Sequence, residues 1–288
     1  MRDAIARFVP DGASVAIGCA LEPAIPFSAG HEIIRQRRRD LTLIGPISDI
    51  LFDQLIGAGC VATVVAAWIG NVSAGLAHCY RRATEQGIPR RIEVVDHSNF
   101  SIGLALLAGA LAAPYIPTKT LLGSDISRTN PTLREARDPF SDDRILLVPA
   151  IHPDVTVVVA QQADAEGNAQ LWGPWGVSEE AALAADRVIV VADRLVDGDV
   201  IGRDPNATLV PAPKTCAVVV EEGAAHPSPL QDRYGRDHDF FGEYHGATRT
   251  LEGFDGWLRE WVLSVPDRAA YLAKLGARWN VLRGDRTR

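Results

Sequence analysis

The stretches VTVVVAQ (residues 155–161) and RVIVVA (residues 187–192) decide the fold of this chain. Both are rich in β-branched residues and are apolar almost throughout. This pattern is typical of strands that are buried on both faces of a sheet, as parallel strands are. Shorter runs of the same character occur at residues 14–18, 41–45, 61–67, 91–95, 144–148 and 215–220.

Helical patterns lie between many of these runs, at residues 27–38, 48–56, 72–86 and 101–112. Alternation of strand and helix predicts an α/β protein with a mainly parallel sheet flanked by helices. Residues 124–143 are polar and contain two prolines, and we interpret them as a long excursion that forms a lid or a partner contact.

The C-terminal part of the chain changes character. Residues 240–249, 253–263 and 267–275 predict two or three additional helices, with Pro266 marking a break. We find no low-complexity linker and no internal repeat. The organisation we expect is one domain over residues 1–279 and a frayed tail over residues 280–288.

Composition excludes several classes of function. The chain has 288 residues, 47% of them hydrophobic, and a net charge of −7, so it lacks the basic surface of a nucleic-acid-binding protein. The apolar run at residues 102–116 is too short to span a membrane. Charged Arg2 and Asp3 follow Met1 directly, which is unlike a signal peptide. The four cysteines form no CxxC pair, and we expect reduced thiols in a cytoplasmic protein.

Common catalytic motifs are missing from the sequence. It contains no GxGxxG after a strand, no GxxxxGK[ST], no GxSxG and no HExxH, so dinucleotide, P-loop, α/β-hydrolase and zincin chemistry are not supported. Histidines and aspartates gather irregularly near the C-terminus. We interpret this group as solvated loop residues and helix caps, not as a metal site: His226, His238, His245, Asp232, Asp237 and Asp239.

A series of short motifs, taken in order, resembles the α subunits of family I CoA-transferases, and glutaconate CoA-transferase in particular. The resemblance covers residues 2–276. Cys19 stands where the family has the second of two glycines after the first strand. The motifs are DGASVAIG (11–18), WIGN (68–71), DHSN (96–99), LAGAL (107–111), PYIPT (114–118), LLGSD (121–125) and ADAEGNAQ (163–170).

The resemblance implies a CoA-transferase/NagB-like fold and a specific chemistry. A glutamate attacks an acyl-CoA thioester, an acyl-glutamyl anhydride and then a glutamyl-CoA thioester form, and CoA passes to a second carboxylic acid. That glutamate normally belongs to an SENG-like motif in a partner β subunit, and this chain has no such motif. The implied partners are therefore an acyl-CoA, a carboxylic acid and a β subunit. CoA thioester is a substrate, with no permanently bound cofactor and no metal.

The DHSN motif holds the candidate catalytic residues. The Asn99 amide can donate a hydrogen bond to the oxyanion that forms on the thioester carbonyl, as the family's amide at this place does; it can equally cap the following helix. Capping is favoured for Ser98, which also counts as a substrate-binding candidate. Asp96 is a general base or, as we favour, a loop carboxylate bonded to nearby N–H groups. His97 can bond substrate or tune a carboxylate.

Further substrate-binding candidates lie in other turns. Gly70 and Asn71 can let substrate approach the backbone, although a plain turn with an Asn cap is slightly favoured. By resemblance, Gly123 and Ser124 border the acyl pocket.

Two other functions stay open beside CoA transfer. The first is an α subunit of a CoA-thioester-dependent hydrolase, including carbon–carbon cleavage, in which the segment from Asp96 to Asn99 activates water. The second is a non-catalytic scaffold subunit, with which Cys19 at a glycine position would agree.

Overall fold

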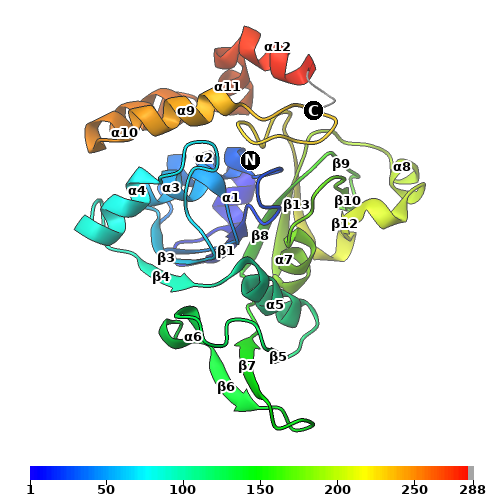
Figure 1. Ribbon diagram of the computed structural model, residues 1–288. Helices are drawn as coiled ribbons and strands as arrows, with labels where there is room; N and C mark the ends of the chain where they lie inside the picture. The colour runs from blue at the N-terminus through cyan, green and yellow to red at the C-terminus, as the bar shows by residue number, and fades with distance from the viewer. Residues whose placement is uncertain (285–288) are drawn as a thin grey trace.

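The computed structural model describes residues 1–284, and its centre is a sheet of seven parallel strands in the order β13-β11-β8-β1-β2-β3-β4 (Figure 1). The predicted α/β class is confirmed. The strands are β1 Ser14–Ile17, β2 Leu41–Ile44, β3 Val61–Ala66, β4 Glu93–Asp96, β8 Val155–Ala160, β11 Arg187–Ala192 and β13 Thr215–Val220.

Helices cover both faces of this sheet, which is why its central strands are apolar throughout. All six residues of β8 are buried. In β1, Val15 and Ile17 pack in the large core with α1, α2 and α3, whereas Ala16 packs on the other face with α5 and α7. These helices are α1 Arg2–Phe8, α2 Phe27–Arg35, α3 Asp49–Gly57, α5 Asn99–Ala110 and α7 Ser178–Ala184.

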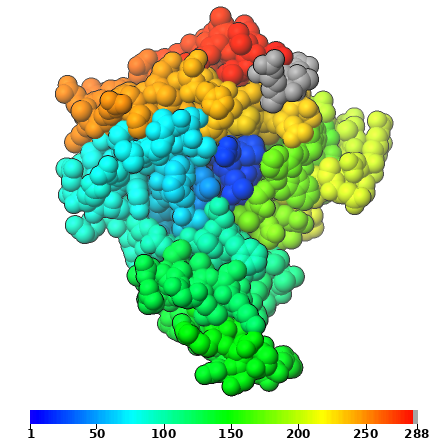
Figure 2. All heavy atoms as spheres, in the orientation of Figure 1, coloured from blue at the N-terminus to red at the C-terminus, as the bar shows by residue number. Residues whose placement is uncertain are grey.

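Three further strands form an arm that stands out from the body (Figures 1 and 2). They are β5 Tyr115–Thr118, β6 Arg134–Arg137 and β7 Arg144–Pro149, antiparallel in the order β5-β7-β6, with α6 Ile126–Thr129 beside them. Residues 144–148 are thus a strand as predicted, but not one of the parallel sheet. Their burial alternates: Leu146 and Val148 are buried against Ala105 of α5, while the residues between them are half-exposed.

A small antiparallel sheet lies beyond β8, and short helices connect the last strands. These elements are β9 Gln162–Ala163, β10 Ala169–Gln170, β12 Thr208–Val210, α8 Gly198–Gly202 and the 3-10 turns Pro205–Ala207 and Ala212–Lys214. No helix within residues 1–284 is both long enough and apolar enough to cross a bilayer.

The C-terminal helices form an outer layer over α2, α3 and α4 (Figure 1). Aromatic side chains join the layers: Phe27 of α2 packs edge-on against Phe241, and Tyr244 packs against Trp257. The predicted C-terminal helices are confirmed, with one more at the end. They are α9 His238–Ala247, α10 Leu251–Leu258 with a π-helical turn Arg259–Leu263, α11 Arg268–Leu275 and α12 Ala277–Gly284.

Three boundaries differ from the sequence prediction. The helix expected over residues 27–38 ends at Arg35, because Arg37 and Asp40 adopt positive φ angles of 55° and 60°. The helix expected over residues 72–86 begins only with α4 His78–Arg81 and continues as the π-helical turn Arg82–Gln86. The tail expected from residue 280 is helical as far as Gly284, and residues 285–288 lie outside the described part.

Candidate active site

The carboxyl ends of β1, β2, β3 and β4 meet at one edge of the sheet, because these strands are parallel neighbours. Ligands of open α/β sheets bind at such an edge. The turn after β3 carries Gly70 and Asn71, and the turn after β4 carries His97, Ser98 and Asn99. These predicted residues are therefore brought to adjacent turns.

Ser98 caps α5. Its Oγ accepts from the Ser101 N–H at 3.0 Å, and its own N–H donates to Ser101 Oγ at 2.9 Å. This reciprocal pair satisfies two backbone donors that a helix start leaves unpaired. The capping role predicted for Ser98 is confirmed.

Asn99 is the first residue of α5 and is not the cap. Its side chain is exposed, and within residues 1–284 its amide has no hydrogen-bond partner. The amino end of a 12-residue helix carries partial positive charge and favours anions. An unoccupied amide NH2 at this place can donate to a forming oxyanion without titrating. The capping alternative is removed, and the donor role remains a prediction.

His97 braces the same turn from below. Its N–H donates to Ala66 O at 2.9 Å, which extends the pairing of β3 with β4, and its Nδ1 lies 3.0 Å from Ser101 Oγ. Burial lowers the pKa of His97 to about 4, so the imidazole is neutral at pH 7. A ring this buried serves the turn and not the solvent side of the site.

The Asp96 carboxylate is exposed at the end of β4, and within residues 1–284 it accepts no hydrogen bond. The expectation of bonds from nearby N–H groups is therefore wrong. It is the main-chain carbonyl of Asp96 that is bonded, accepting from Asn130 Nδ2 at 2.7 Å. The carboxylate charge acts on Tyr80, whose pKa is raised first by burial and second by Asp96.

The turn after β3 is built around Asn71. Its buried Oδ1 accepts from the N–H groups of Ser73 and Ala74, both at 3.0 Å, and its Nδ2 donates to Phe241 O at 2.9 Å. Both polar atoms of the side chain are thus used to hold the turn. A Cβ at Gly70 would lie 2.1 Å from the Trp68 ring, so only glycine lets that ring lie there.

Gly123 and Ser124 lie in the arm, in a turn before α6, with Gly123 at φ +82° and Ser124 Oγ donating to Leu121 O at 2.7 Å. The arm reaches the site edge through buried Asn130, the residue that bonds Asp96 O. Asn130 was not among the residues predicted from sequence. Its signal was the Asn-Pro dipeptide with Pro131, which marks a turn but does not identify its partner.

Large apolar side chains are exposed on the turns after β3 and β4. We call them the edge patch: Trp68 (40% exposed), Val72 (37%), Leu76 (50%) and Phe100 (57%). Contiguous apolar surface of this kind marks a site of interaction.

Cys19, in the place of the family's second glycine, is closed in by its neighbours. Burial, with a smaller effect of Glu180, raises the pKa of its thiol to about 12, so it is no nucleophile at neutral pH. Gly18 has φ +74°, and a Cβ there would lie 2.6 Å from Ser48 Oγ. The carbonyl of Cys19 accepts from the Val177 N–H at 2.9 Å.

The C-terminal histidines need a correction, since His226 is buried and not solvated. Its Nε2 lies 2.9 Å from Asp237 Oδ2 and its Nδ1 lies 2.9 Å from Tyr271 OH. Within residues 1–284, no three His, Cys, Asp or Glu side chains are placed to share a metal ion.

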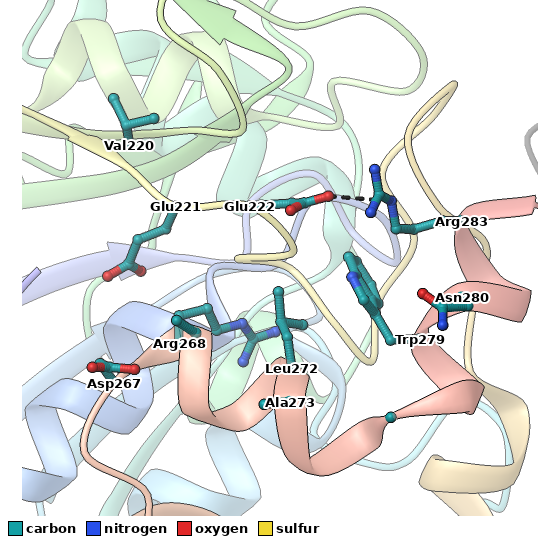
Figure 3. Close-up of a pocket in the computed structure, with 12 residues that line it drawn as sticks. Val220, Glu221, Glu222, Asp267, Arg268, Leu272, Ala273, Trp279, Asn280 and Arg283 are labelled. Atoms are coloured by element: carbon teal, nitrogen blue, oxygen red, sulfur yellow. Dashed lines mark ion pairs between the residues drawn. The ribbon is translucent and has the colours of Figure 1, made fainter.

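A cavity of about 630 Å³ lies between the end of β13 and the helices α11 and α12, far from α5. Figure 3 shows Glu222 paired with Arg283 across it, at 3.2 Å. Arg268 in its wall is buried and donates to Gly223 O at 2.8 Å. None of the predicted site residues lines this cavity.

A family model described as Coenzyme A transferase matches residues 1–221. The chain belongs to the coenzyme A transferase family. Two relatives within it are α-type subunits of named enzymes. The chain is 37% identical to that of the 3-oxoadipate CoA-transferase of Pseudomonas knackmussii, with 96% of each chain covered. It is 30% identical to that of the glutaconate CoA-transferase of Acidaminococcus fermentans, with 96% of this chain and 91% of the relative covered.

The crystal structure of glutaconate coenzyme A-transferase from Acidaminococcus fermentans superposes with a TM-score of 0.91 at 29% identity, covering 97% of this chain and 93% of that one. The fold and family that the motifs implied are therefore confirmed. This CoA-transferase chain is a subunit of the same type as the two relatives.

Proposed function

We propose that this chain is the α subunit of a heteromeric acyl-CoA:carboxylate CoA-transferase, which moves CoA between two carboxylic acids through a glutamyl-CoA intermediate on a β subunit. The observation that carries the proposal is the unoccupied Asn99 amide at the start of α5, next to the edge patch. CoA thioester is the substrate, and no cofactor is held permanently. The unpaired thiols of the chain suit the reducing cytoplasm.

The chemistry needs a nucleophile that the described site does not supply. The turns after β3 and β4 contain no glutamate, and the thiol of Cys19 is protonated. A carboxylate of the β subunit would attack the thioester carbonyl and release CoA thiolate, leaving an acyl-glutamyl anhydride. The thiolate then attacks the glutamyl carbonyl, which frees the first acid. The reverse steps with a second acid return the glutamate.

The role we assign to Asn99 is to donate a hydrogen bond to the carbonyl oxygen as it becomes negative. Donors fixed in advance are more effective than water, because they need not reorient during the reaction. Asn99 is fixed by its place on the helix that Ser98 caps. The partner that brings the glutamate would also cover the edge patch, whose apolar side chains a β subunit would bury.

The first prediction follows from this role. In the complex with the β subunit, Asn99→Ala lowers kcat for CoA transfer by roughly 100–1,000-fold. The matched control is Asn206→Ala, another exposed asparagine, which lies in the 3-10 turn Pro205–Ala207 far along the chain. The measurement is acyl exchange between an acyl-CoA and a carboxylate, followed by chromatography of the CoA esters.

Equal activity of the Asn99→Ala and Asn206→Ala complexes would refute the role of Asn99. Release of free CoA without need for an acceptor acid would refute transfer itself and favour the hydrolase alternative, in which Asp96 is the residue to examine. Full activity of Asn99→Ala in a complex that cannot form without this chain would favour the scaffold alternative.

A further inference from the structure

The residues that follow the family match contact the candidate site directly. The match ends at residue 221, whereas residues 236–248, which we call the clamp segment, bond to residues 67–82, which we call the site segment. The contacts run along the whole site segment: Asn71 Nδ2 to Phe241 O (2.9 Å), Ser73 Oγ to Arg236 Nη2 (3.1 Å), Leu76 O to His245 Nδ1 (3.3 Å) and Arg82 Nη1 to Thr248 O (2.9 Å).

A buried aspartate of α3 joins the first part of the two segments. Asp49 Oδ1 accepts from the Val72 N–H at 3.2 Å, and Asp49 Oδ2 pairs with Arg236 Nη2 at 2.5 Å. The Arg236 guanidinium also lies 3.9 Å from the centre of the Phe241 ring. One carboxylate thus receives a backbone donor from the site segment and a side-chain donor from the clamp segment.

A second aspartate repeats the arrangement one helical turn later. Asp53 Oδ1 accepts from the Tyr80 N–H at 2.7 Å, and Asp53 Oδ2 accepts from Tyr244 OH at 2.7 Å. Residues four apart on a helix share a face, so Asp49 and Asp53 both point between the two segments. Both are buried, and buried carboxylates need such partners.

The site segment leads directly to the candidate catalytic turn. It leaves β3 at Ala67, and the last residue of β3, Ala66, accepts the His97 N–H that sets the turn of Asn99. It also carries Trp68, Val72 and Leu76 of the edge patch. Its position therefore fixes one wall of the site and most of the patch.

We propose that Arg236 and Tyr244 are positioning residues of the active site, which act through Asp49 and Asp53 to hold the site segment for catalysis. The C-terminal helical layer is then part of the catalytic unit. The catalytic consequence rests on the proposed function. Misplacement of a site by about 1 Å costs on the order of 100-fold in rate.

The test uses Tyr244→Phe, which removes a single hydroxyl, and Arg236→Gln, each in complex with the β subunit. The matched control is Arg233→Gln: Arg233 is in the same part of the chain and pairs with Asp193 at 2.5 Å, but it does not bond to the site segment. We expect faster amide hydrogen exchange over residues 72–80 in both test variants, by about 10-fold, and unchanged exchange there in the control.

In the same variants kcat and kcat/KM should fall together by about 10–100-fold with KM unchanged, since placement of the site matters most in the transition state. Arg236→Lys should recover part of kcat. Unchanged exchange at residues 72–80, or an equal change in Arg233→Gln, would overturn the proposal. If Arg236→Gln does not fold, Tyr244→Phe alone decides.

Hydrogen exchange needs no turnover, so the two proposals can fail separately. If the wild-type complex transfers no CoA, the proposed function fails, and the exchange result still decides whether the clamp segment holds the site segment. If transfer is normal and exchange at residues 72–80 is unaffected by Tyr244→Phe, only the clamp is wrong.

Discussion

Ser98 and Asn99 are neighbours in the turn after β4, yet they have different tasks. Sequence alone made both candidates for the helix cap, because both residue types accept from N–H groups at a helix start. Geometry separates them: the cap position is taken by Ser98, whose hydroxyl and N–H both bond Ser101. Asn99, one residue later, keeps its amide free for a ligand.

This division gives a prediction for stability. Ser98→Ala should lower the free energy of unfolding by about 1 kcal/mol, because it removes a cap and half of a capping box. Asn99→Ala should change it by no more than about 0.5 kcal/mol, as for an exposed residue without partners. Urea unfolding of the two variants measures both. A larger loss for Asn99→Ala than for Ser98→Ala would reverse the assignment.

Residue types in the site turns were readable from sequence, but their long-range partners were not. Asn71 was recognised as a turn former, and its two bonds within the turn fit that. Its third bond, to Phe241 O, joins residues 170 positions apart. Asn130, which bonds Asp96 O, was missed for the same reason. No local pattern encodes such contacts.

Among the elements, the long apolar strands were the most predictable and the exposed ones the least. Burial on both faces makes β8 and β11 apolar throughout, and this is visible in sequence. The run at residues 144–148 is also apolar, but it alternates between α5 and the outside of the arm. Composition alone cannot distinguish these two environments. The helix predicted over residues 72–77 is wrong because Asn71 hydrogen bonds form a turn there.

The C-terminal layer is held by a buried polar network around His226. The imidazole lies between Asp237 and Tyr271, and Asp237 also pairs with Arg278 at 2.5 Å. Burial, which outweighs the neighbouring Asp237 carboxylate, lowers the pKa of His226 to about 4. Burial acts to raise the pKa of Asp237, but the hydrogen bonds from His226 and Arg278 together outweigh it and lower that pKa to about 2.

Acid should therefore weaken this layer. The unfolded chain takes up a proton on His226 near pH 6.5 and the folded chain only near pH 4, so stability is complete above pH 6.5 and is lost as the pH falls towards 4. Between pH 7 and pH 5 this residue accounts for a loss of about 2 kcal/mol. Urea unfolding at both pH values measures it, and His226→Gln should lose correspondingly less. An identical pH dependence in His226→Gln would contradict the buried neutral state.

At the scale of the whole molecule, the α/β class and the family followed from strand pattern and motif order, whereas the strand order did not. Sequence does not state that β8 lies beside β1 or that β4 is at the edge. Nor does it show that residues 236–248 return to the turn after β3. The arm, at the other end of the molecule, was expected only as a polar excursion (Figure 2).

The molecule as a whole presents an incomplete active site. It has a hydrogen-bond donor at Asn99, an apolar edge patch and no glutamate in the turns after β3 and β4. We predict that the isolated chain has no CoA-transferase activity with succinyl-CoA or glutaconyl-CoA and acetate. Turnover by the purified chain alone would show that the nucleophile is in this chain after all.

The most direct test of the central claim is intact-mass analysis of the chain co-purified with its β subunit, once the complex has been incubated with an acyl-CoA in the absence of acceptor acid. We predict an unmodified mass for this chain and a hydroxylamine-sensitive CoA adduct on the β subunit. A CoA adduct on this chain, or release of free CoA with neither protein modified, would contradict the assignment as the α subunit of a CoA-transferase.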